Sequence, residues 1–200
     1  MTKNEFLQRF QLQHLATSPH TYRYYGQLQS AAVLIPIVEV ELEDNARQLN
    51  IVFTKRAEHL THHGGQVSFP GGKAEPFDAD LINTALREAQ EEIGLNIENI
   101  DIIGQLHPYQ TISGYLVTPV IAFITAKQNY LRDPNEVAEI FQVPLAHFLD
   151  TDNHHAINIF QKSSEHQVHF MPYQEYNIWG ATAAMLKDLI THLSYSKQTN

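Results

Sequence analysis

The sequence predicts an α/β fold, an α/β/α sandwich in which a mixed β-sheet lies between helices. Runs rich in β-branched residues alternate along the chain with segments of helical periodicity, and this order favours a sheet with helices on both faces. Of the 200 residues 43% are hydrophobic, which is enough to build the core of one domain. Because no internal repeat, low-complexity tract or linker interrupts the chain, we expect one domain at residues 21–200 after a helical extension at residues 1–20.

The expected strands are apolar, β-branched-rich runs bounded by turn-forming residues. Only the turn-prone sequence EDNAR separates the first two, so these should be neighbours. The glycine- and proline-rich stretch Thr61–Gly72 predicts a loop with at most one short extended segment. The expected strands are Ala31–Leu42, Leu49–Arg56, Ile97–His107, Tyr115–Thr125, Ala156–Gln161 and Gln167–Met171.

Four segments have the apolar spacing of helices. Asn4–Leu15 should form a short amphipathic helix that either covers the core or mediates the contacts of a homodimer. The short segment PLAHFL and the longer Ile178–Leu193 follow in the second half of the chain. The fourth helix lies in the middle, where Asp78 or Asp80 can cap its start and Gly94 can end it in a left-handed conformation.

Composition excludes several classes of function. The formal net charge is -9 and the basic residues are scattered singly, so we expect no nucleic-acid partner, and a polyphosphate substrate would need a metal ion. The absence of cysteine rules out disulfides, a thiol nucleophile and a thiolate zinc site, and it fits a reducing compartment. No apolar run approaches the roughly 20 residues of a membrane helix. We therefore expect a soluble cytoplasmic protein with no membrane partner and a small-molecule substrate.

The middle helix carries a dense acidic face. Glu88, Glu91 and Glu92 share one arc, opposite an apolar arc made by Ile82, Ala85, Leu86, Ala89 and Ile93. Most acidic helix faces are simply solvated, but Glu88 and Glu92 stand at i, i+4, where like charges destabilise a helix. Three carboxylates on one rigid helix suit a hard cation such as Mg²⁺. The spacing therefore favours metal binding over a solvated face.

Two neighbouring features support this interpretation. Arg87 is placed at i, i+4 to Glu91, where it compensates part of the negative charge. Gly71 and Gly72 precede the helix, and without a Cβ they let the backbone approach an ion or a phosphate closely.

The stretch Gly71–Leu95 resembles the signature of the Nudix hydrolases. The second half of that signature matches without exception at Arg87, Glu88, Ala89, Glu91, Glu92, Gly94 and Leu95. In the first half, counting from Gly72, Asp78 stands in place of a glutamate, and one extra residue separates it from Arg87.

The same extension is typical of the coenzyme A pyrophosphatase branch, whose second motif is similar to residues 52–72. The residues that match it in register are Thr54, Arg56, Ala57, Gly65, Phe69, Pro70, Gly71 and Gly72. Val52 and Phe53 replace two leucines, and Thr61 stands where the branch has an arginine. The resemblance continues through residues 113–123, 135–145 and 178–183.

The resemblance implies hydrolysis of a nucleoside diphosphate linked to another moiety. Mg²⁺ or Mn²⁺ would be held by Glu88 and Glu92 as principal ligands and by Glu91 as a further one, with Arg87 orienting Glu91. Glu88 is one candidate for the general base. Glu136 and Glu139 are alternatives as a base or an extra ligand, although Glu136 is equally well explained as a surface acid.

For the branch, the implied substrate is coenzyme A or its thioesters, cut to 4'-phosphopantetheine and adenosine 3',5'-bisphosphate. The substrate-binding candidates are Arg56, Gln66, Ser68, Gly71 and Gly72. Arg56 would contact a phosphate, or else is a strand-end charge that faces water.

Several aromatic and histidine side chains can be interpreted either as substrate contacts or as ordinary structural residues. His62 and His63 either touch the 3'-phosphate or are ordinary loop residues, and the histidine doublets lack the spacing of a helical zinc site. Trp179 is expected as a core anchor rather than a base-stacking residue. Tyr109 and Tyr115 could border the adenine.

Two other functions stay open. Because Thr61 replaces the arginine of the branch, the first alternative is a Nudix hydrolase that acts on NADH, ADP-ribose or a nucleoside triphosphate. A non-catalytic nucleotide-binding regulator is the second alternative, against which the intact Arg87, Glu88, Glu91 and Glu92 argue.

Overall fold

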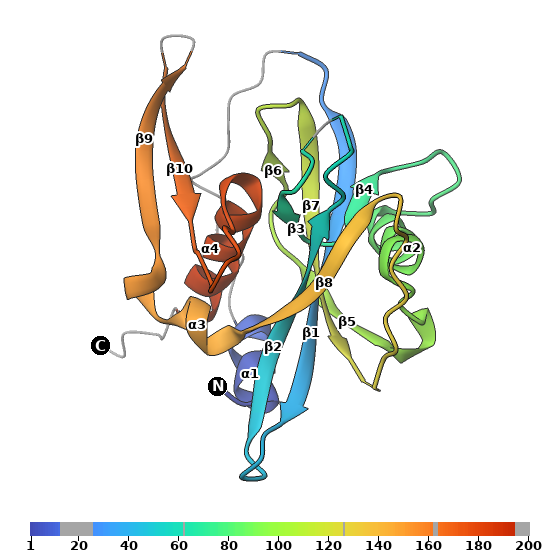
Figure 1. Cartoon of the computed structure of the whole chain (residues 1–200), viewed down its shortest axis with the longest axis vertical. Coiled ribbons are helices and arrows are strands. Elements are labelled where there is room, and N and C mark those ends of the chain that lie inside the picture. Colours follow the sequence, from blue (N-terminus) through green and yellow to red (C-terminus); the bar gives the residue numbers. More distant parts are fainter. Residues whose placement is uncertain (13–25, 62, 126, 162–163, 195–200) are drawn as a thin grey trace.

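A computed structural model describes residues 1–12, 26–61, 63–125, 127–161 and 164–194 of the chain. It confirms the predicted fold class, because a large mixed β-sheet lies between helices on its two faces (Figure 1). None of the helices in these residues is long and apolar enough to span a membrane.

The sheet is built around β1 (Gln29–Glu41), which pairs antiparallel with β2 (Arg47–Arg56) and parallel with β7 (Tyr115–Ile124). Strands β1 and β2 are the two neighbours that the EDNAR turn predicted. The strand order is β3-β2-β1-β7-β5, and β4, β6 and β8 pair with β1, β7 and β2 respectively. The remaining strands of the sheet are β3 (Val67–Ser68), β4 (Gly71–Lys73), β5 (Ile100–Gln105), β6 (Tyr109–Gln110) and β8 (Val137–Pro144).

The helices cover the two faces of the sheet unequally (Figure 1). On one face lies α2 (Leu81–Ile93), and on the other lie α1 (Lys3–Gln11), α3 (Leu145–Leu149) and α4 (Gly180–Ser194). Successive residues of β1 therefore enter different cores: Ile35 packs in the cluster that contains α4, and Leu34 in the one that contains α2. Burial on both faces explains the nearly continuous apolar run of β1.

Beyond α4 stands a separate two-stranded hairpin, β9 (His155–Gln161) and β10 (Ser164–Phe170), which is visible at the left of Figure 1. Its strands form a two-stranded sheet with each other, Phe170 makes an isolated bridge with Trp179, and β10 packs against α4. The hairpin is thus an addition to the main sheet rather than part of it.

The N-terminal helix is locally encoded and packed into the core. Thr2 and Glu5 form a reciprocal capping box at its start, and Phe6 and Phe10 are buried. It ends at Gln11, earlier than the predicted Leu15, and residues 13–15 lie outside the described residues, as does the expected domain boundary at residues 20 and 21.

Other differences from the sequence prediction arise from pairing between distant segments. The Thr61–Gly72 stretch contains β3 and the start of β4, because it pairs with both β2 and β1. Strand β8 was not predicted, and it pairs with the edge of β2 that is opposite β1. The start of the predicted Ile97–His107 strand is a short 3₁₀ helix capped by Asn96, so β5 begins only at Ile100.

Candidate active site

Helix α2 is delimited by the signals that the sequence predicted. The Asp80 carboxylate accepts a hydrogen bond from the Asn83 N–H, and Gly94 ends the helix with a φ of 66°. Because both ends are set locally, the helix places Ala85, Ala89 and Ile93 against the sheet, and it leaves its glutamates beside β4.

Asp78, the other candidate cap, has a different partner. Its two carboxylate oxygens accept hydrogen bonds from Arg87 Nε at 3.0 Å and Nη2 at 3.1 Å, and the Thr84 hydroxyl donates to it as well. The Asp78 side chain is only 5% exposed. These bonds from Arg87 hold the pKa of the Asp78 carboxyl well below its usual range. Asp78 is therefore the anchor of Arg87 rather than a helix cap.

Arg87 connects several parts of the acidic site. Its Nη1 lies 2.9 Å from Glu88 Oε1 and 3.0 Å from Glu91 Oε2, and its Nη2 donates to the Lys73 carbonyl oxygen. The predicted contact with Glu91 is present. Through the Lys73 carbonyl, the guanidinium also links α2 to β4. The residue spacing within the helix could not predict that contact.

Glu92 is the most deeply buried carboxylate of the helix, with 4% of the residue exposed. Its Oε2 accepts a hydrogen bond from the Gly71 N–H at 3.2 Å, and its Oε1 lies 3.8 Å from Arg56 Nη1. Burial raises the pKa of Glu92 to about 8, and the charges of Glu136 and Glu88 act in the same direction. Gly71 and Arg56 thus compensate only part of the cost of burying this charge.

Glu88 lies against the backbone of β4. An ideal Cβ at Gly72 would stand 2.5 Å from the Glu88 carboxyl carbon, so only glycine leaves room for this side chain where it is. Burial also raises the pKa of Glu88, although Arg87 opposes the shift. The Glu91 side chain, in contrast, is 61% exposed.

The donor set suits a hard divalent cation, but it is not assembled around one point. Among the described residues, no three His, Cys, Asp or Glu side chains form a group that could hold a metal ion. Arg87 occupies one oxygen each of Glu88 and Glu91, and Glu92 accepts the Gly71 N–H. The buried Glu92 and the partly buried Glu88 both have raised pKa values, and with the charge of Glu136 they fit a cation that supplies the missing positive charge. The three-glutamate ligand set stays a prediction.

Glu136, just before β8, and Glu139, within β8, have different surroundings. The Glu136 charge raises the pKa values of both Glu88 and Glu92, so it acts electrostatically on the acidic site. Glu139 instead accepts a hydrogen bond from the Tyr176 hydroxyl, whose ring stacks on Phe141 at a centroid distance of 3.6 Å. That bond raises the pKa of Tyr176 to about 12. Both glutamates stay candidates, and the hydrogen bond from Tyr176 to Glu139 favours Glu136.

A groove of about 440 Å³ opens beside Arg56 and Gly71. Gln66 and Ser68 line it, as the sequence predicted, and so do His63 and Tyr109. Tyr115 does not border it, because its ring lies under the Lys73 ammonium. His62 lies outside the described residues.

Trp179 is not the core anchor that we expected. It is 39% exposed, it lines the groove, and it stacks on Phe170 of β10 at 6.2 Å between ring centroids. The residue precedes the first turn of α4 instead of lying on the buried side of that helix. No sequence pattern predicted the exposure of Trp179, because it depends on the packing of Trp179 against the β9–β10 hairpin.

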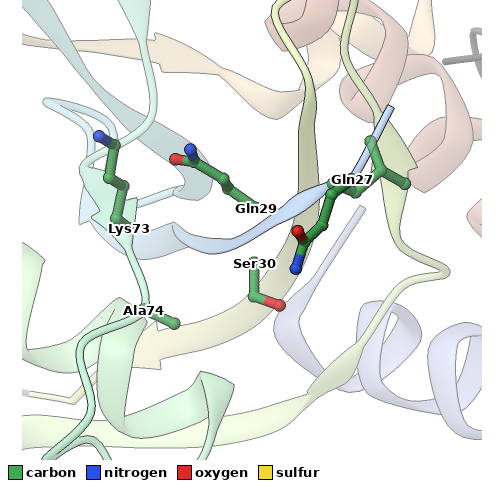
Figure 2. A pocket seen from close by; sticks show the side chains of 6 residues that line it. Gln27, Gln29, Ser30, Lys73 and Ala74 are labelled. Carbon is green, nitrogen blue, oxygen red and sulfur yellow. The ribbon is translucent and has the colours of Figure 1, made fainter. Parts of the chain in front are cut away.

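A second hollow, of about 520 Å³, borders β4 and the start of β1. Figure 2 shows the Lys73 ammonium and the Gln29 amide on one side of it, with Ser30 and Ala74 nearby. Its lining is polar, which contrasts with the apolar groove.

Comparisons with known proteins agree with this geometry. Residues 33–188 match the model of the NUDIX domain. Proteins named as uncharacterized Nudix hydrolase NudL from Yersinia pestis (strain Pestoides F) and Yersinia pseudotuberculosis serotype O:1b (strain IP 31758) are each 37% identical over 196 residues, which cover 96% of this chain and 94% of theirs. The crystal structure of a MutT/nudix family protein from Enterococcus faecalis shares the fold with a TM-score of 0.52 at 14% identity, over 95% of this chain and 68% of that one.

Proposed function

This chain belongs to the Nudix hydrolase family, whose members cleave phosphoric anhydride bonds with divalent metal ions, and from that premise we propose that it hydrolyses coenzyme A or its thioesters. Addition of water across the P–O–P bridge gives 4'-phosphopantetheine, acylated where the substrate is a thioester, and adenosine 3',5'-bisphosphate. We also propose a cytoplasmic location, because a chain without cysteine fits a reducing compartment.

One observation carries the proposal. The buried Glu92 of the acidic helix contacts both the Gly71 N–H and the Arg56 guanidinium. Gly71 and Arg56 belong to the upstream motif that resembles the coenzyme A pyrophosphatase branch. The two motifs, which overlap in the sequence at Gly71 and Gly72, therefore also meet in space at one carboxylate, as expected if they serve one reaction.

The roles follow from these contacts. Glu88 and Glu92 are the principal ligands of Mg²⁺ or Mn²⁺, and Glu91 is a further one. When bound, the ion polarises the phosphoryl oxygens and lowers the pKa of water. Arg87, anchored on Asp78, orients Glu88 and Glu91 without touching the substrate. Glu88 or Glu136 accepts the proton of the attacking water.

The substrate side of the site lies around Arg56. This side chain is 28% exposed and lines the groove while it contacts Glu92, so it can turn toward a phosphate. Gln66, Ser68 and Gly71 line the groove as well. Gly72 acts on the acidic side instead, because a Cβ there would meet the Glu88 carboxylate.

Product analysis by mass spectrometry tests the proposal. The purified protein is incubated with Mg²⁺ and, in separate reactions, with coenzyme A, NADH, ADP-ribose and a nucleoside triphosphate. We expect preferential release of adenosine 3',5'-bisphosphate from coenzyme A. Preferential cleavage of another substrate would keep the family activity and reject the branch, and coenzyme A binding without turnover at any divalent metal would indicate a regulator.

A further inference from the structure

The hairpin that stands apart from the main sheet has an open strand edge. Strand β10 lies between β9 and α4, so β9 is the outer strand (Figure 1). Among the described residues, β10 is the only strand that pairs with β9, and it does so along the whole length of β9. Backbone N–H and C=O groups of alternate β9 residues therefore point outward, where they can hydrogen-bond to a further strand.

The outer strands of the main sheet do not offer such an edge. Strands β3, β4 and β6 have only two or three residues each. Strand β5 contains Asp101 and a register shift between Ile102 and Gly104, and β8 contains Glu139 and ends at Pro144. Short length, charges, proline and irregular pairing are the features that keep edge strands from joining other chains.

Strand β9 has none of these features. Its seven residues, HAINIFQ, include no Asp, Glu, Lys, Arg, Pro or Gly, and its pairing with β10 runs without a register shift. Ile157 is 53% exposed and Phe160 is 81% exposed. A hairpin of two strands is also only marginally stable without further strands. These properties are typical of an edge that another strand covers.

The charge of the chain favours a second copy as the source of that strand. The formal net charge is -9, so two copies repel each other over most of their surfaces. In a two-fold interface each residue lies near its own counterpart, so a charged residue close to the axis would repel itself. Because β9 has no acidic or basic residue apart from His155, it can meet a second β9 without that repulsion.

The sequence of β9 is self-complementary about its middle residue. Antiparallel pairing of two copies centred on Asn158 places the two Asn158 amides opposite each other, where they can hydrogen-bond. The same register places Ile157 opposite Ile159 of the second copy, and the small Ala156 opposite the large Phe160. Each side chain thus meets one of matching polarity.

We propose that two copies of this chain form a homodimer in which their β9 strands pair antiparallel about Asn158, so that the two hairpins become one four-stranded sheet. The inference does not depend on the identity of the substrate. Helix α1, the surface from which the sequence suggested homodimer contacts, is packed into the core instead. The dimer also supports the groove, because Ile159 and Val168 of the hairpin line it.

The first test is the mass of the protein in solution. Contact between two seven-residue strand edges is small, so the dimer should dissociate on dilution. In sedimentation equilibrium between about 1 and about 500 µM, the mass should rise from the 22.8 kDa of one chain toward twice that value. A mass that stays at one chain throughout would overturn the proposal and leave the edge to a strand of another protein.

Two variants locate the interface. Phe160→Lys should weaken dimerisation by about tenfold or more, because it places a charge on each side of the contact. The control is Leu131→Lys, since Leu131 is 74% exposed and lies outside the hairpin. It should leave the monomer–dimer equilibrium unchanged. Equal dimerisation of Phe160→Lys and the wild type would place the interface elsewhere and contradict the proposal.

A single introduced thiol tests the register, because the chain has no cysteine. In Asn158→Cys the two thiols lie opposite each other across the axis, and paired Cα atoms about 4.5–5.5 Å apart are within reach of a disulfide. Mild oxidation should give a covalent dimer on a non-reducing gel.

Gln167→Cys is the matched control for the thiol. Gln167 pairs with Asn158 but belongs to β10, so it lies one strand farther from the axis on each copy. The two Gln167 Cα atoms would be about 14 Å apart, which is too far for a disulfide. This variant should stay monomeric on the gel. Equal cross-linking of the two variants, or no cross-linking of Asn158→Cys, would overturn the proposed pairing.

Discussion

Two regions that meet at Gly71 are built in different ways. The acidic site comes from one nearly continuous stretch, in which β4, the turn after it and α2 follow one another along the chain. The apolar groove is assembled from residues near positions 56–71, 109–113, 159–168 and 179–182. A locally encoded site is rigid and tolerates little change, whereas walls from remote segments can vary independently. Substitutions in the first region should therefore reduce turnover itself, and those in the second should change which substrate is preferred.

Glu92→Gln should give the largest loss. We expect kcat to fall by about 100-fold or more, because the amide cannot replace a carboxylate beside the reacting phosphate. The melting temperature measured in a metal chelator should not fall, since the amide oxygen can still accept the Gly71 N–H and the repulsion with Glu88 and Glu136 is relieved. Steady-state kinetics and thermal unfolding measure the two effects.

Glu91→Gln is the matched control for that variant. Its side chain is 61% exposed, and it accepts a hydrogen bond from Arg87. The loss of kcat should be clearly smaller than for Glu92→Gln. Equal losses, or a marked drop in the metal-free melting temperature of Glu92→Gln, would contradict the view that burial distinguishes the two glutamates.

Gly72→Ala tests how tightly the backbone of β4 defines the acidic site. The added Cβ would stand 2.5 Å from the Glu88 carboxyl group, so this side chain must move away. We expect kcat to fall by about 10- to 100-fold, because a displacement of about 1 Å at a reactive site has effects of that size. Titration with Mn²⁺ should show weaker binding. Unchanged kcat and unchanged Mn²⁺ affinity would show that Glu88 does not need its observed position.

Glu136→Gln compares the two glutamates of the β8 region. The charge of Glu136 acts on Glu88 and Glu92, so its loss should lower kcat by about tenfold, whether it serves as a base or as an extra ligand. Glu139→Gln is the control, because the Glu139 carboxylate is held by Tyr176. A pH profile of kcat that changes in the Glu136 variant and not in the control would favour the role as a base. Identical kinetics of both variants with the wild type would exclude both glutamates.

The sequence predicted most of what is local. Strands β1, β2 and β7, the limits of α2 and the Arg87–Glu91 contact all follow from patterns within a few residues. It did not predict β8, whose sequence lacks a regular alternation of polar and apolar residues and which pairs along β2. The exposure of Trp179 and the burial of Glu92 were likewise unpredictable, because each depends on segments at least 9 residues away, namely β10 and Gly71. The contacts within and around α2 could thus be predicted, and the shape of the groove could not.

Asp78→Asn should give the smallest change in turnover and a clear change in stability. Its carboxylate holds Arg87 through two hydrogen bonds with little exposure to water, so removing the charge should lower the free energy of unfolding by about 2 kcal/mol. Activity should fall only a few-fold, because Arg87 keeps its contacts with Glu88 and Glu91. Urea unfolding and steady-state kinetics of both proteins measure these effects.

The pH dependence of that stability difference distinguishes a charge effect from a packing effect. The pKa of Asp78 is lowered in the folded chain, relative to an ordinary value of 3.8. The folded state therefore favours the carboxylate, and its contribution is complete above that value and is lost as the pH falls below it. The wild type should exceed Asp78→Asn in stability at neutral pH, and the two should converge in acid. A difference that persists unchanged below pH 3.8 would mean that the side chain acts by its shape, and that Arg87 is held by other contacts.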